Sequence, residues 1–228
     1  MQSLDFKGFT PATFQFFKDL EMNNNKEWFD KNRKIYETEV RDRFKELCVS
    51  LIPAMRSIDP TFELRPHRCI SRINRDIRFS ADKSPYKTHL WMTFMIPSTS
   101  DQWISLPGFF LELGAKEYMY GMGIYQPKRT VMDDFRDHMA YRSKEFQEVT
   151  QKRVFERGFV VGGEEYKRPI KNDLDEYFQQ WYHRKGIYAY KTCPVGQEAY
   201  SKEFQERIQE DFLALEWLYN FMKQSIPE

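Results

Sequence analysis

The sequence has no apolar run long enough to span a membrane, and no basic segment followed by an apolar stretch near Met1. We therefore expect no membrane partner and no secretion. It has only three cysteines, Cys48, Cys69 and Cys193, without paired spacing, which argues against a disulfide framework and favours a reducing compartment. The resulting prediction is a cytoplasmic protein.

The chain also lacks internal repeats, low-complexity tracts and linker-like segments, so one domain over residues 1–228 is the simplest prediction. It has little excess charge, since 35 Lys and Arg face 34 Asp and Glu and the formal net charge is +1. Nucleic acid is therefore disfavoured as a partner, although aromatic residues near the basic ones (Phe79, Tyr86, Trp91) could stack on bases. Aromatic residues make up 17% of the chain, which argues against disorder and indicates an aromatic core.

Motifs of well-known reactions are missing too: the sequence has no nucleophile elbow, phosphate-binding loop or dinucleotide fingerprint. His67 and Cys69 would share one face of a strand, and three further residues could join them (His89, His183, Cys193), but the spacing of a metal site is absent. We therefore predict no metal site. Cofactor, catalytic residues, oligomeric state and the question of whether the protein is an enzyme stay open.

What the sequence does have is a dense basic segment, residues 65–87, with seven basic side chains against two acids in a nearly neutral chain. The basic residues are Arg65, Arg68, Arg72, Arg75, Arg78, Lys83 and Lys87, and the acids are Asp76 and Asp82. Residues 68–79 alternate in polarity, which predicts a strand with arginines on one face. The run SADKSPYK then predicts a turn, because Ser, Asp and Pro favour turns.

This segment is the candidate binding site. Guanidinium groups bind phosphates and carboxylates with two hydrogen bonds, and lysine adds a point charge. We therefore predict an anion site, in which Tyr86 hydrogen-bonds the ligand or gives it a proton, and Asp76 has a lowered pKa and neutralises one arginine. The predicted ligand-binding residues are Arg72, Arg75, Asp76, Arg78, Lys83, Tyr86 and Lys87. The alternative is a non-enzymatic interaction or scaffold domain, in which these charges form a structural ion-pair network.

Periodicity around the segment predicts the fold. Helices are expected from Thr10-Pro11 to residue 25, and from a capping box at Asn24 and Glu27 to Pro53, which ends or kinks the second helix. Strands are expected at 89–96, 109–113 and 118–125. The first is predicted to be fully buried, because its apolar run is continuous. Together with 68–79 they would form an antiparallel meander.

Further on, we expect helices from Thr130 and Ser143, a hairpin near 159–166, a short helix at 174–181 and a strand at 187–191, before a final helix of about six turns. The predicted fold class is α+β, a mostly antiparallel sheet with helices packed on one face and arginines lining the other. Gly121 and Gly123 would leave a smooth patch, where another backbone or a ligand can approach.

Three motifs carry a resemblance to a known family. The segment NNxxWF (Asn24, Asn25, Trp28, Phe29), the run RINRDIRFSADKSPYKT over residues 72–88 and the later Gly-x-Tyr at 123–125 resemble the bacterial and fungal domain-of-unknown-function family numbered 2461. The resemblance covers nearly the whole chain, but it implies no activity, cofactor or catalytic residue. In that family a proline pair with a glycine follows a later Lys-Arg, and Lys167-Arg168-Pro169-Ile170-Lys171 departs from this pattern.

Overall fold

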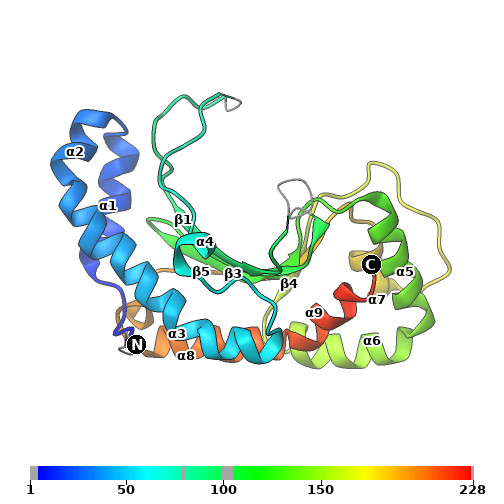
Figure 1. The fold of residues 1–228 in the computed structure, drawn as a ribbon. Coiled ribbons are helices and arrows are strands. Elements are labelled where there is room, and N and C mark those ends of the chain that lie inside the picture. The colour runs from blue at the N-terminus through cyan, green and yellow to red at the C-terminus, as the bar shows by residue number, and fades with distance from the viewer. Residues whose placement is uncertain (1–4, 79–80, 99–104, 227–228) are drawn as a thin grey trace.

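The structure is a computed structural model that describes residues 5–78, 81–98 and 105–226. Over these residues the protein has a five-stranded sheet in the order β1-β2-β3-β5-β4, and each neighbouring pair is antiparallel. The strands are β1 (Leu90–Met95), β2 (Gly108–Leu113), β3 (Glu117–Ile124), β4 (Val160–Gly162) and β5 (Ile187–Pro194). The predicted α+β class is confirmed (Figure 1).

Helices precede and follow the first three strands. They are α1 (Pro11–Met22), α2 (Lys26–Ile35), α3 (Asp42–Ile58), α4 (Pro66–Cys69), α5 (Arg129–Tyr141), α6 (Ser143–Thr150), α7 (Glu176–Tyr182), α8 (Glu203–Ala214) and α9 (Glu216–Lys223). Within the described residues, no helix is both long enough and apolar enough to cross a bilayer.

Several of the predicted helix boundaries differ in the structure. The cap of α2 is Asn25 rather than Asn24, because the Asn25 side chain accepts a hydrogen bond from the amide of Trp28. Pro53 does not end the long helix: a π-helical turn, Tyr36–Arg41, joins α2 to α3, and α3 continues through Pro53 to Ile58. The final helix is divided at Leu215 into α8 and α9.

The sheet has one covered and one open face. Figure 1 shows α8 and α9 crossing beneath the strands, with α3 alongside α8. Side chains that point toward these helices are buried, such as Met92 and Leu111, whereas alternate ones such as Trp91 and Phe110 are half-buried. The prediction that residues 89–96 are buried on both faces is therefore wrong. Helices on one face of the sheet are confirmed.

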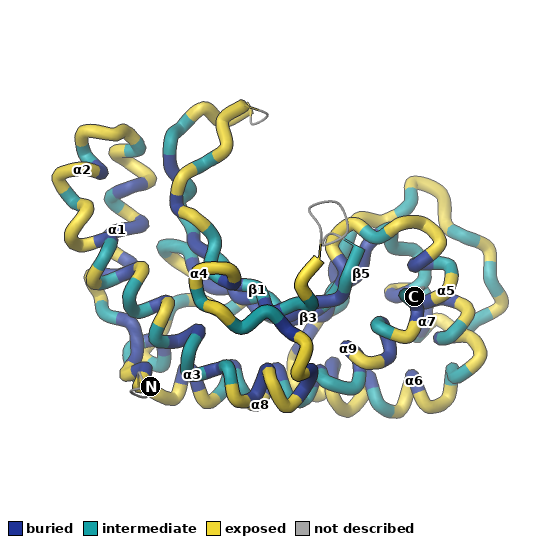
Figure 2. The backbone as a smooth tube through the Cα atoms, in the orientation of Figure 1, coloured by how far each residue is buried: buried dark blue, intermediate teal, exposed yellow. Residues whose placement is uncertain are grey.

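The predicted strand over residues 68–79 is also wrong in its described part. Pro66 starts the short helix α4, as proline at a first helical position does, and beyond it the chain makes only two isolated bridges, Ile70 with Met92 and Asn74 with Tyr86. Residues 70–78 and 81–89 form two legs that pair mainly with each other, and we call them the arm. The outer arm is exposed (Figure 2), and Ile77 within it is 45% exposed, so the outer arm has no apolar face to bury in a sheet. The meander is therefore made by β1, β2 and β3.

Two smaller predictions have different outcomes. The segment at 159–166 does not form a hairpin of its own, because β4 pairs with β5 instead. The glycine patch on β3 does allow another backbone to approach. A Cβ atom at Gly121 would lie 2.0 Å from the carbonyl oxygen of Ala189, and one at Gly123 would lie 2.2 Å from that of Ile187.

A buried carboxylate ties the sheet to α8. Asp211 on α8 is almost fully buried and accepts hydrogen bonds from the Tyr120 hydroxyl and the Lys191 ammonium, each at 2.6 Å. Arg157 adds a third contact through its Nε at 3.1 Å. Burial and the adjoining carboxylate raise the pKa of Tyr120 far above its ordinary value. This network joins β3, β5 and α8, so it stabilises the sheet rather than an open site.

Candidate functional site

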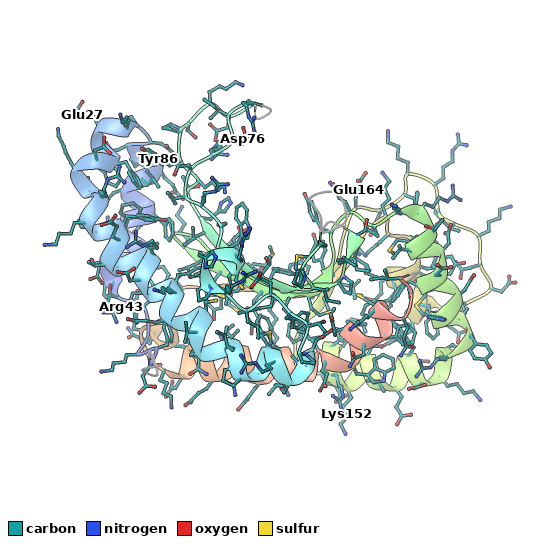
Figure 3. The ribbon with its side chains drawn as sticks, viewed as in Figure 1. Glu27, Arg43, Asp76, Tyr86, Lys152 and Glu164 are labelled. Atoms are coloured by element: carbon teal, nitrogen blue, oxygen red, sulfur yellow. The ribbon has the colours of Figure 1, made fainter. Side chains whose placement is uncertain are left out.

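The arm is fixed to the helices through Tyr86. The Tyr86 ring is buried and stacks on Phe29 of α2, with ring centroids 4.0 Å apart and an interplanar angle of 14°. The Asn24 side-chain amide donates to the Tyr86 carbonyl at 2.9 Å, and its oxygen accepts from the Tyr86 amide at 3.1 Å. Figure 3 shows Tyr86 in the leg of the arm that faces α1 and α2. Tyr86 therefore anchors the arm.

The anchor gives the first testable prediction. Asn24→Ala should lower the free energy of unfolding by about 2 kcal/mol, because the Tyr86 amide loses its partner next to a buried ring. It should also expose the arm to limited proteolysis. The matched control is Asn23→Ala, since among the described residues the Asn23 side chain makes only an exposed hydrogen bond, to the Asp19 carbonyl. Urea unfolding and digestion with trypsin measure both effects. Equal stability and equal digestion of the two variants would contradict this role for Asn24.

Two of the predicted arginines have carboxylate partners within the arm. Arg78 donates to Asp76 through Nε at 3.0 Å and Nη2 at 2.7 Å, and these bonds lower the pKa of Asp76 to about 2. Arg75 forms an ion pair with Asp82 at 3.0 Å and also donates to the Tyr86 carbonyl at 3.3 Å. The prediction that Asp76 neutralises an arginine is confirmed. Figure 3 places Asp76 in the outer part of the arm.

The other three predicted cations have no carboxylate partner among the residues that the structure describes. Lys83 donates to the carbonyl of Ile77, and Lys87 to the carbonyl of Arg72, each at 2.8 Å. Burial, and then the neighbouring Arg75 and Arg72, lower the pKa of Lys87. The Arg72 side chain is exposed. Among the described residues, its guanidinium makes no hydrogen bond and no ion pair. Positive charge at the base of the arm is therefore not balanced locally.

Lys87 connects the arm to the open face of the sheet. Its Nζ lies 4.1 Å from the centroid of the Trp91 ring, and Trp91 is the first residue of β1 that points to this face. Trp91 also borders a hollow of about 410 Å³. The hollow is lined by Trp91, Thr93, Met95, Leu106, Gly108, Phe109, Phe110, Glu112, Met119, Gly123, Tyr125 and Tyr188. Its lining is largely apolar and aromatic, which is typical of small-molecule sites.

Sequence reasoning did not identify this hollow. It arises because β1, β2, β3 and β5 bring alternate residues onto one face, and this register joins residues far apart in the chain. Trp91, for example, lies directly opposite Glu112, and Gly123 lies opposite Tyr188. The sequence signal nearest to it is the glycine patch on β3, because Gly123 lines the hollow.

The residues considered for a metal are not brought together. Within residues 5–78, 81–98 and 105–226, no three His, Cys, Asp or Glu side chains gather as a metal site would require. His67 is exposed on α4, whereas Cys69 is buried against Cys48. The contact with Cys69, together with burial, raises the pKa of Cys48 well above that of an ordinary thiol, so Cys48 is not a reactive cysteine.

The fold and the site together define an α+β protein with one open sheet face, and with a cationic arm anchored beside that face. Residues 12–221 match the model of a family described as conserved hypothetical protein (DUF2461), and the chain belongs to this family. A comparison with curated proteins found no match. At the anchor of the arm, Asn24 and Phe29 each contact Tyr86, and the three residues come from two of the motifs that carry the resemblance.

Proposed function

We propose that this protein binds a small molecule that carries a phosphate or carboxylate group, and that Lys87 and Arg72 hold the anion. One observation carries the proposal: the Lys87 ammonium is half-buried beside two guanidinium groups, with no carboxylate partner in the described residues. Crowded like charges destabilise one another, and an anion between them removes this cost. Lys83 adds positive potential further along the arm.

The other candidate residues have supporting roles in this proposal. The Arg78–Asp76 and Arg75–Asp82 pairs hold the shape of the outer arm, and Tyr86 anchors it, so these five residues position the cations. A cytoplasmic location is part of the proposal, since Cys48, Cys69 and Cys193 are all free thiols.

A second candidate function is a non-enzymatic interaction or scaffold domain. The observation that favours it is the internal pairing of Arg75 and Arg78 with acids two to seven residues away, which is what a structural ion-pair network would show. The two functions differ in their predictions for Arg72 and Lys87. In a scaffold neither side chain binds an anion, whereas the proposed binding function requires both side chains to hold the anion.

Titration with inorganic phosphate and citrate at constant ionic strength tests the proposal. We expect both anions to raise the melting temperature of the wild-type protein, and the double variant Arg72→Ala/Lys87→Ala to bind them about tenfold more weakly or worse, because two charge-assisted contacts are lost. The control is Lys144→Ala, which removes an exposed charge from α6, far from the arm in Figure 1. An equal response of the wild type and the double variant would overturn the binding function.

A further inference from the structure

The hollow on the open face contains one polar group that its surroundings do not explain. Glu112 is half-buried on β2, between Trp91 of β1 and Met119 of β3. Across the described part of the chain, its carboxylate has neither a hydrogen-bond donor nor an ion-pair partner. It borders this largely apolar hollow and also a second, polar hollow that His89 and Lys116 line. A carboxylate that is partly withdrawn from water favours neighbouring hydrogen-bond donors. Glu112 therefore indicates a ligand with N–H or O–H groups.

The surfaces around Glu112 indicate a flat ligand. Trp91, Phe110 and Tyr188 supply aromatic surface on three strands, and the Phe110 and Tyr188 rings lie 6.1 Å apart at 86°. Gly108 and Gly123 are directly opposite each other in the floor between them, so neither position adds a side chain of its own there. A floor of glycines between aromatic walls accepts a planar ring better than a branched group.

The positions of Glu112 and Lys87 limit the ligand further, because both neighbour the same side chain. Trp91 lies opposite Glu112 in the β1–β2 register, and the Lys87 ammonium lies over its indole ring. A molecule that reaches from the carboxylate to the ammonium must therefore pass along Trp91. It needs donors at one end, a flat body, and an anion at the other end.

We propose that the ligand is a mononucleotide, with its base in the hollow, an N–H edge of the base at Glu112 and its phosphate at Lys87 and Arg72. This inference rests on the proposed anion-binding function and names its substrate class. Carboxylates accept hydrogen bonds from amino groups of bases, and bases stack on aromatic side chains irrespective of sequence. A hollow of about 410 Å³ is within the usual range for sites of small ligands.

Two other occupants fit the observations less well. A fatty acid would fill an apolar hollow and place a carboxylate at Lys87, but its chain would cover Glu112 without donating to it. A nucleic-acid strand would need several stacking positions along a basic groove, whereas the contact between the arm and the border of the hollow is made by Lys87 over Trp91.

Isothermal titration with the four ribonucleoside monophosphates, a single-stranded oligonucleotide, ribose 5-phosphate, inorganic phosphate and decanoate tests the inference. We expect at least one mononucleotide to bind about tenfold more tightly than ribose 5-phosphate, since base–aromatic stacking adds to the phosphate contact. Glu112→Gln should weaken the binding of that nucleotide about fivefold or more and change the preference among bases. The amide oxygen is a weaker acceptor than the carboxylate, and the amide NH₂ would face the N–H donors of the base. It should leave phosphate binding unchanged.

Two further variants complete the design. Trp91→Leu keeps an apolar side chain and should weaken nucleotides more than phosphate, and its melting temperature reports whether the fold is intact. Glu148→Gln on α6 is the control for Glu112→Gln, because Glu148 is exposed and lies outside the hollow.

The outcomes separate the two proposals. If phosphate binds through Arg72 and Lys87 but no mononucleotide exceeds ribose 5-phosphate, the nucleotide inference is overturned and the anion site stands. If no anion binds, both are overturned. Decanoate that binds more tightly to Glu112→Gln than to the wild type would show an acyl ligand and overturn the nucleotide inference. Binding of an oligonucleotide without any binding of mononucleotides would overturn it as well.

Discussion

Gly121→Ala should lower the free energy of unfolding by about 3 kcal/mol or more, because it forces two strands of the sheet apart. The added Cβ atom would lie 2.0 Å from the carbonyl oxygen of Ala189 and 2.8 Å from the Cα of Tyr190. Both are backbone atoms of β5, so no side chain can rotate away to relieve the contact. The β3–β5 pairing lies in the middle of the sheet, and its disruption also affects β4, which pairs with β5 alone among the described strands.

Urea unfolding monitored by circular dichroism measures this effect, and Gly196→Ala is the matched control. Gly196 has no heavy atom within 4 Å of the position that a Cβ would take, and its φ is −127°, which any residue can adopt. We expect Gly196→Ala to change stability by less than about 0.5 kcal/mol, as surface substitutions usually do. If the two variants were equally stable, the close approach of β3 and β5 would be refuted.

Asp211→Asn should have the second largest effect, a loss of about 3 kcal/mol. The substitution keeps the shape of the side chain but removes the negative charge. This charge pairs with Lys191, whose side chain is only 16% exposed, and with Arg157. Breaking a buried ion pair by removing one partner leaves the other charge away from water without compensation. The Tyr120 hydroxyl keeps an acceptor in the amide oxygen, so the loss reports the charge rather than this hydrogen bond.

Glu27→Gln is the control for charge removal. The Glu27–Lys31 pair on α2 is 80% and 71% exposed, and exposed pairs of this spacing contribute about 0.5 kcal/mol or less. Thermal unfolding of the two variants at the same ionic strength compares them. A loss for Asp211→Asn as small as that for Glu27→Gln would mean that Lys191 and Arg157 find other partners or water.

The sequence predicts most of the helices and strands because their apolar periodicity is local and strong. The strand predicted at residues 68–79 was wrong for an identifiable reason. Polar and apolar residues alternate there, but alternation yields a strand only where the apolar set can be buried, and Ile77 is 45% exposed. Pro66 also favoured a helical turn at the entry to the arm, which strand reasoning did not take into account.

The candidate site was predictable only in its local part. The ion pair of Arg78 with Asp76 joins residues two apart in the chain, so charge alternation alone indicated it. The hollow depends instead on which strands become neighbours and in what register. Trp91 and Glu112 are ordinary residues of two strands until the β1–β2 pairing places them opposite each other. No spacing in the sequence carries this information.

The contact between the two ends of the chain has a consequence for its synthesis. Phe9 packs on Phe204 with ring centroids 5.5 Å apart, and its amide donates to the Ala199 carbonyl at 2.8 Å. Helix α3 likewise packs along α8. These early segments emerge from the ribosome first but find their permanent neighbours only after residues near 200 have been translated. This fold is therefore completed only after residues near 200 have been translated.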